Sequence, residues 1–277
     1  MKRIFVLITL LLVIIAGCIN ITQPPPVPVV TPPASSSNLT SPPMTQPPSV
    51  QPTTGQINSN QQNQSIQLST PPTSDGLKLQ SQNEHFIFYA NDTDAKAIPD
   101  LTNSLESNYT VILDHLKATM AGKVKIEIYP DLKAYHAAVG RPDAPDWSVG
   151  SVSGFGIKMV SPLNSGGVHT YEAMLQIITH EFTHVVERTL NPNMGTSLRW
   201  LWEGTATYEA KQINGVSNTV KSKIQSNSIP SLKQLEGSST EFGNLGGYQF
   251  SYTIAEYIIK TYGYNKLRAL IIQSGCH

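Results

Sequence analysis

The chain has 277 residues, and its 19 basic and 19 acidic side chains give a formal net charge of zero. This balance gives no overall basic excess, so nothing in the composition suggests a nucleic-acid partner. Only two cysteines are present, and because Cys18 ends a signal-like segment, Cys276 has no partner for an internal disulfide.

Residues 1–17 have the pattern of a secretory signal peptide. A basic start precedes an apolar run of about a dozen residues, which is too short to span a membrane comfortably. The run ends in Ile-Ala-Gly-Cys at residues 15–18, which resembles a prokaryotic lipobox. The resemblance implies cleavage before Cys18 and lipidation of its thiol. The lipid would anchor the protein to the cell membrane, with the folded domain outside the cytoplasm. An ordinary signal peptide with an incidental cysteine is the alternative.

Residues 18–76 form a linker by composition. From residue 19 to residue 74 there is no charged or aromatic side chain, and 13 of the chain's 20 prolines lie there. Such a segment cannot bury enough apolar surface to offset the entropy of ordering it. We therefore expect a disordered stalk, followed by a folded domain over residues 77–277.

The folded domain begins with alternating strand and helix signals. Aromatic, β-branched and alternating apolar residues predict strands at 85–89 and 124–129. An apolar stripe at helical spacing predicts a helix from Ala95 to Met120 with Asp94 as its cap. The elements that follow are a short helix over residues 132–139 and a glycine-rich strand pair or edge over residues 147–160.

Residues 179–185 contain His-Glu-x-x-His inside an apolar run that predicts a helix capped by Thr170. His180 and His184 lie four residues apart, so on a helix both rings project from one face. Two neutral imidazoles and a carboxylate suit Zn²⁺, and Glu181 is placed to act as general base. A solvated pair of histidines on a helix is the alternative.

A second segment follows after eighteen residues and places Glu203 in Trp-Leu-Trp-Glu-Gly-Thr-Ala-Thr-Tyr. Residues 191–195 predict a turn between the two helical runs. A second helix packed back on the first would bring Glu203 to the metal as third ligand. Without the histidine pair, Glu203 would be read as a surface glutamate.

Together these motifs resemble the gluzincin zinc peptidases of the thermolysin and aminopeptidase-N superfamily, most closely the peptidase MA-like domains. The resemblance implies a zincin-like α+β fold, with an N-terminal mixed-sheet lobe and a C-terminal helical lobe. It also implies one zinc per chain, substrate binding by an edge strand at residues 154–159, and a tyrosine near the substrate. Tyr248 is preferred for that role and Tyr252 is the alternative, although either can simply pack a helix predicted over residues 253–262.

Two supporting roles stay open at this point. Thr207 or Glu209 is expected to accept the second ring N–H of the zinc-binding histidines. The other five histidines are read as structural or exposed, with a cleft role as the alternative for His169: they are His85, His115, His136, His169 and His277.

The sequence therefore predicts a membrane-anchored, extracytoplasmic zinc peptidase that acts on peptides or proteins. The Gly-x-Met-Glu-Asn signature of the aminopeptidases is absent from the sequence, which favours an endopeptidase. The resembling domains carry more helix after the segment that matches residues 266–270, so we expect a C-terminally truncated form. A catalytically silent lipoprotein of the same fold is the main alternative, and a metal-free solute-binding lipoprotein is a third reading.

Overall fold

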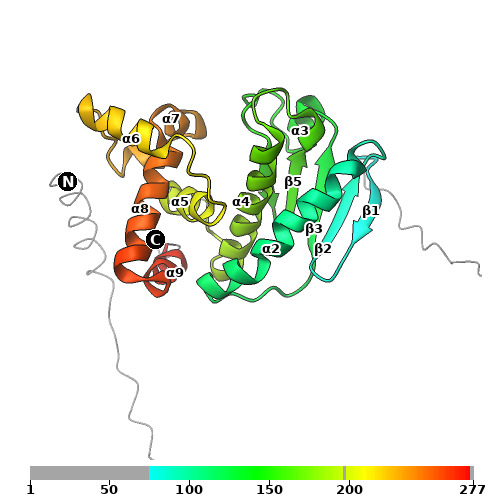
Figure 1. Ribbon diagram of the computed structural model, residues 1–277, viewed down its shortest axis with the longest axis horizontal. Coiled ribbons are helices and arrows are strands. Elements are labelled where there is room, and N and C mark those ends of the chain that lie inside the picture. The colour runs from blue at the N-terminus through cyan, green and yellow to red at the C-terminus, as the bar shows by residue number, and fades with distance from the viewer. Residues whose placement is uncertain (1–74, 196–197, 275–277) are drawn as a thin grey trace, which may run out of the picture. The chain divides into compact units, whose positions relative to one another are not determined.

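Residues 75–195 and 198–274 are described by the structure, a computed structural model (Figure 1). The predicted signal peptide, the lipidation site Cys18, almost all of the linker, Cys276 and His277 lie outside these residues. Among the described helices, none combines the length and the apolar character needed to cross a membrane.

Five strands form one mixed sheet in the order β1-β2-β3-β5-β4. The strands are β1 (Lys78–Gln82), β2 (Phe86–Ala90), β3 (Val124–Tyr129), β4 (Gly150–Ser153) and β5 (Gly156–Val160). The predicted strands at 85–89 and 124–129 are present as β2 and β3, which pair in parallel. Strand β1 was not predicted, because its sequence KLQSQ has a single apolar side chain; it pairs antiparallel with β2.

The glycine-rich segment forms the predicted strand pair, a hairpin of β4 and β5 that turns at Gly154, where φ is +59°. Strand β5 pairs with β3 on one side and with β4 on the other, so β4 is the outer strand. The expectation of a substrate-binding edge at residues 154–159 is therefore wrong. Both edges of β5 are already hydrogen-bonded, and among the described strands the unpaired edge at this end of the sheet belongs to β4.

Helix α2 (Ile98–Leu116) is shorter at both ends than the predicted helix. A separate 3₁₀ turn at Asp94–Ala97 precedes it, so Asp94 does not cap the α-helix. The left-handed conformation of Lys117 ends it. The apolar stripe is buried as predicted, at Ile98, Leu101, Leu105, Ile112 and Leu116.

Helix α4 (Tyr171–Leu190) packs against α2, β4 and β5 on one side and against α5 on the other (Figure 1). The ring of Phe182 lies 5.6 Å from that of Phe86 in β2 and 5.4 Å from that of Tyr109 in α2. Such aromatic contacts add to the burial of apolar area and fix the helix on the sheet. The short helix α3 (Leu132–Ala138) packs against β3 and β5.

The rest of the described chain is helical. It comprises α5 (Arg199–Glu209), α6 (Val216–Gln225), α7 (Ser239–Asn244), α8 (Gly247–Tyr262) and α9 (Tyr264–Gln273). Helix α8 begins six residues before the predicted start at Thr253, after Gly246 with φ of +75°. The result is an α+β architecture, a small mixed sheet and helices, as predicted from the sequence.

Candidate metal centre

Helix α4 positions the two histidines. Thr170 begins the helix as predicted, with its hydroxyl accepting a hydrogen bond from the Ala173 N–H at 3.2 Å. His180 and His184 follow on one face, and their ring centroids lie 4.5 Å apart with the rings nearly perpendicular. Both side chains are buried.

Helix α5 brings Glu203 to the same place. The chain turns after α4 and re-enters a helix at Arg199, and α5 packs back on α4. The indole of Trp202 stacks on the ring of His184, with centroids 3.8 Å apart and an interplanar angle of 3°. This contact joins the two helices directly beside Glu203 and fixes the orientation of the His184 ring.

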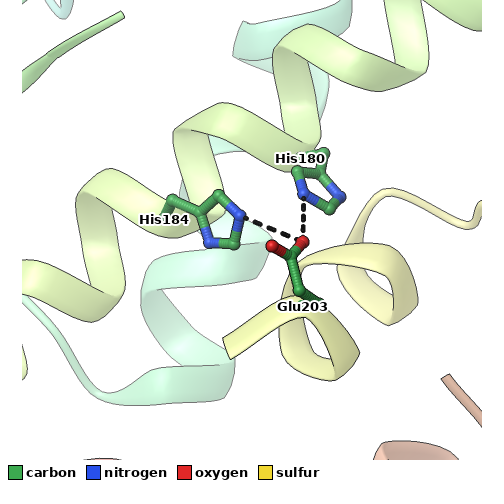
Figure 2. Close-up of side chains that lie close together, drawn as sticks. All are labelled: His180, His184 and Glu203. Carbon is green, nitrogen blue, oxygen red and sulfur yellow. Dashed lines mark ion pairs between the residues drawn. The ribbon is translucent and has the colours of Figure 1, made fainter. Parts of the chain in front are cut away.

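The three predicted ligands converge (Figure 2). Oε2 of Glu203 lies 3.2 Å from Nε2 of His180 and 3.7 Å from Nε2 of His184. One candidate ligand atom from each residue falls within 4.8 Å of the others. Three buried nitrogen and oxygen donors at this separation can hold one small cation.

The second nitrogen of each histidine has its own partner. Nδ1 of His180 lies 2.9 Å from Oε1 of Gln212, and Nδ1 of His184 lies 3.0 Å from Oε2 of Glu187. Acceptors at these positions favour the proton on Nδ1 of a neutral ring, which leaves the Nε2 lone pair facing Glu203.

The expectation that Thr207 or Glu209 fills this supporting role is therefore wrong. The Thr207 hydroxyl donates to the backbone carbonyl of Glu203 at 2.6 Å, as helical threonines commonly do. Glu209 is buried on another side of α5, where it binds Nδ1 of His115 at 2.9 Å. Glu187 lies three residues after His184, so helical spacing was a usable signal, whereas no local pattern points to Gln212.

The electrostatics of the three residues favour cation binding. Burial opposes ionisation of Glu203, but hydrogen bonds from His180 and His184 hold its pKa well below the usual range. Burial and the charge of His180 lower the pKa of His184 to about 4. Burial would also lower the pKa of His180, yet the hydrogen bond and charge of Glu203 raise it above its ordinary value. A metal ion would replace the proton that His180 holds.

Glu181 projects into the cleft beside this centre. Burial, with a further contribution from the charge of Glu203, raises the pKa of its carboxyl to about 7, although the charge of His180 opposes the shift. Its carboxylate meets the outer strand β4 at Gly150, where an added Cβ would lie only 2.7 Å from Oε1 of Glu181. A carboxyl with this pKa can both accept and return a proton near neutral pH.

A cleft of about 750 Å³ surrounds these groups, lined by α4, α5, α7, the start of α8 and the outer strand β4. Tyr248 lines it, whereas Tyr252 points to Tyr208, with ring centroids 5.4 Å apart, and is not among the lining residues. His169 also lines the cleft, and its Nε2 contacts the carbonyl of Trp147 at 3.1 Å.

The remaining described histidines have structural contacts. His85 stacks on Tyr109 with centroids 3.8 Å apart, and His115 stacks on Tyr264. Nε2 of His136 lies 2.9 Å from the carbonyl of Ser148.

The donor set fits zinc. Two imidazole nitrogens and one carboxylate are the ligands of many catalytic zinc sites, which keep a further position open. Here those donors are buried, they converge, and two further side chains orient the rings.

Comparison with known proteins agrees with this geometry. Residues 144–275 match the family model of the Peptidase MA superfamily, and this range includes α4, α5 and the outer strand β4. No curated protein sequence matches the chain significantly. The part of the chain that carries the candidate metal centre is thus supported as a peptidase MA-like domain.

Proposed function

We propose that the protein is a zinc-dependent peptidase, with His180, His184 and Glu203 as metal ligands. The observation that carries the proposal is the convergence of these buried donors within 4.8 Å, beside a carboxyl suited to proton transfer. When bound, zinc supplies a Lewis acid that polarises a peptide carbonyl and makes water a stronger acid. The match to the Peptidase MA superfamily supports peptide hydrolysis as the reaction.

Glu181 is the proposed general base. Its carboxylate lines the cleft next to the metal ligands, and Glu181 is not one of the three residues that could hold the metal. In this role it takes a proton from the attacking water and passes it to the leaving amine. The outer strand β4 lies beside it and offers the open edge that an extended peptide can join as an added strand.

Tyr248 is the proposed hydrogen-bond donor to the carbonyl oxygen. Burial, with the negative charges of Glu203 and Glu181, raises the pKa of its hydroxyl well above the ordinary value. The hydroxyl stays protonated beside these two carboxylates and can donate a hydrogen bond where negative charge develops. Tyr252 lies outside the cleft lining and is the weaker candidate.

The N-terminal sequence supports a location outside the cytoplasm, at a membrane. The lipobox-like residues 15–18 and the proline-rich segment after them support an extracytoplasmic enzyme tethered through lipid on Cys18. The absence of an aminopeptidase signature from the sequence favours an endopeptidase. Incorporation of labelled palmitate into the wild type but not into Cys18→Ala would test the tether.

The direct test is cleavage of casein by the zinc-loaded protein, compared with Glu181→Gln. We expect chelator-sensitive cleavage by the wild type and a loss of about 100- to 10,000-fold in the variant, with zinc retained. If a folded, zinc-loaded wild type cleaves neither casein nor a random peptide pool, the protein is a silent lipoprotein and the proposal is wrong.

A further inference from the structure

Three arginines line the cleft. Apart from Glu181 and the three candidate metal ligands, the formally charged side chains that line the cleft within the described residues are all arginines: Arg141, Arg188 and Arg199. No lysine and no further carboxylate appears in that lining. Outside the candidate catalytic groups, the charge in the cleft lining is therefore positive, and the other lining residues are formally uncharged.

Arg188 lies one helical turn beyond His184 on the same face of α4. Its guanidinium carbon is 5.6 Å from the ring centroid of Trp202, the same indole that stacks on His184. A guanidinium over an aromatic face is held in place by the ring's negative face. Arg188 is thus positioned directly beside the metal ligands.

Arg199 lies one helical turn before Glu203 on α5. Its Nη1 is 4.0 Å from Oε1 of Glu203, and its Nε donates to the Gly237 carbonyl at 2.9 Å. Arg188 thus contacts Trp202 and Arg199 contacts the neighbouring Glu203, so both arginines lie close to the candidate metal ligands.

Arg188 is held against Trp202 but has no anionic partner among the described residues. Its Nε is buried and makes no hydrogen bond to any described residue. No described carboxylate comes within 4.0 Å of the Arg188 side chain, whereas Arg199 has Glu203 at that distance. A buried donor without an acceptor is unfavourable, and a carboxylate bound by a guanidinium makes a strong, charge-assisted pair.

We propose that Arg188, together with Arg199 next to Glu203, forms a carboxylate-binding subsite that selects peptides with a negative group close to the cleaved bond. This inference rests on the proposed peptidase function and adds the substrate class. The carboxylate has two possible sources, an aspartate or glutamate side chain and the C-terminal carboxylate of the peptide. Both present the same planar pair of oxygens to the guanidinium.

The test uses the full-length, zinc-loaded protein and a pool of N-acetylated random octapeptides, made with either a free acid or an amide at the C-terminus. Products are sequenced by mass spectrometry. Enrichment of Asp or Glu near the cleaved bond in both pools assigns the subsite to side chains. Cleavage confined to the C-terminal end of the free-acid pool assigns it to the terminal carboxylate.

Arg188→Gln and a matched control variant then test whether the preference for acidic peptides depends on Arg188. Arg268 in α9 is the control, because its Nε is also buried without a hydrogen-bond partner among the described residues, yet Arg268 does not line the cleft. For a peptide pair that differs only in Glu versus Gln, or in acid versus amide, we expect an acidic preference in kcat/KM of about tenfold or more. Arg188→Gln should bring that ratio close to one, and Arg268→Gln should keep it.

A binding measurement separates failure of this inference from failure of the proposed function. The same fluorescein-labelled peptide pair is titrated into zinc-loaded Glu181→Gln, with and without Arg188→Gln, and followed by anisotropy. Tighter binding of the acidic peptide that depends on Arg188 supports the subsite even if no cleavage occurs. Equal binding of the acidic and neutral peptides, or a preference that survives in Arg188→Gln, overturns it.

Discussion

Gly150 in the outer strand β4 faces the carboxylate of Glu181 in α4, and a Cβ at Gly150 would lie 2.7 Å from Oε1 and 3.0 Å from Cγ of Glu181. Because Gly150 has no side chain, the space beside it is free for the carboxylate of Glu181, the proposed general base. The contact also joins the strand proposed to bind the substrate backbone to the residue proposed to transfer the proton.

Gly150→Ala should displace the Glu181 carboxylate while leaving the fold intact, because the crowded atoms belong to one flexible side chain. A displacement of about 1 Å at a reacting group costs on the order of 100-fold in rate. We expect kcat to fall by that order, with zinc content unchanged. Gly122→Ala is the control, because a Cβ there meets nothing within 4 Å. Equal activity of the two variants would show that Gly150 does not position Glu181.

The raised pKa of Glu181 predicts a pH-dependent stability in the metal-free protein. Burial raises this pKa from 4.5 to about 7, so the folded state keeps a proton that the unfolded chain has released. The contribution of Glu181 to the free energy of unfolding is fully present below the pKa of the unfolded chain. It is lost as pH rises through about 7. Glu181→Gln does not titrate, so its stability relative to the wild type should rise with pH, by up to about 3 kcal/mol.

Urea unfolding of both proteins in chelator, at about pH 5 and about pH 8, measures this difference. Subtracting the wild type from the variant at each pH cancels groups that titrate alike in both. A difference that is the same at the two pH values would show that Glu181 has an ordinary pKa.

Gly204 allows α5 and α8 to pack closely. An added Cβ would lie 2.5 Å from the backbone carbonyl oxygen of Ser251, which cannot move without moving α8. Gly204→Ala should therefore destabilise the fold by about 1–3 kcal/mol in urea unfolding. Gly243→Ala is the matched helical control, because its Cβ meets nothing within 4 Å, and it should be neutral or slightly stabilising. A neutral Gly204→Ala would contradict this packing.

Gln212 should affect metal affinity without binding the metal. Its Oε1 accepts from Nδ1 of His180 at 2.9 Å and so orients that ring. Loss of such a partner typically weakens metal affinity by about 10- to 100-fold. Competition with a chromogenic chelator should show this loss in Gln212→Ala and not in Gln225→Ala, whose side chain is exposed at the end of α6. Unchanged affinity in Gln212→Ala would exclude the supporting role.

The candidate ligands were predictable from sequence because their geometry is mostly local. Helical spacing places His180 and His184 on one face, and a turn signal at residues 191–195 predicts that the next helix returns to them. The apolar stripe of α2 was predictable for the same reason, since periodicity reports which face of a helix is buried.

The features that sequence analysis missed depend on tertiary pairing. The hairpin of β4 and β5 was visible in the sequence, but which arm is the outer strand depends on its pairing with β3. Gln212 reaches His180 only after α5 has packed on α4, so no spacing rule points to it. The early start of α8 was missed because glycines at 246 and 247 normally indicate a break, whereas here Gly246 precedes the helix and Gly247 begins it.

The most direct test of the proposed metal centre is the zinc content of the purified full chain, measured by mass spectrometry for the wild type, Glu203→Ala and Glu172→Ala. Glu172 lies in the exposed first turn of α4 and serves as the matched control. We expect about one zinc per chain in the wild type and in Glu172→Ala, and a sharp loss in Glu203→Ala. A folded wild type that binds no zinc, or a Glu203→Ala protein that binds it as tightly as the wild type, would contradict the proposed metal centre.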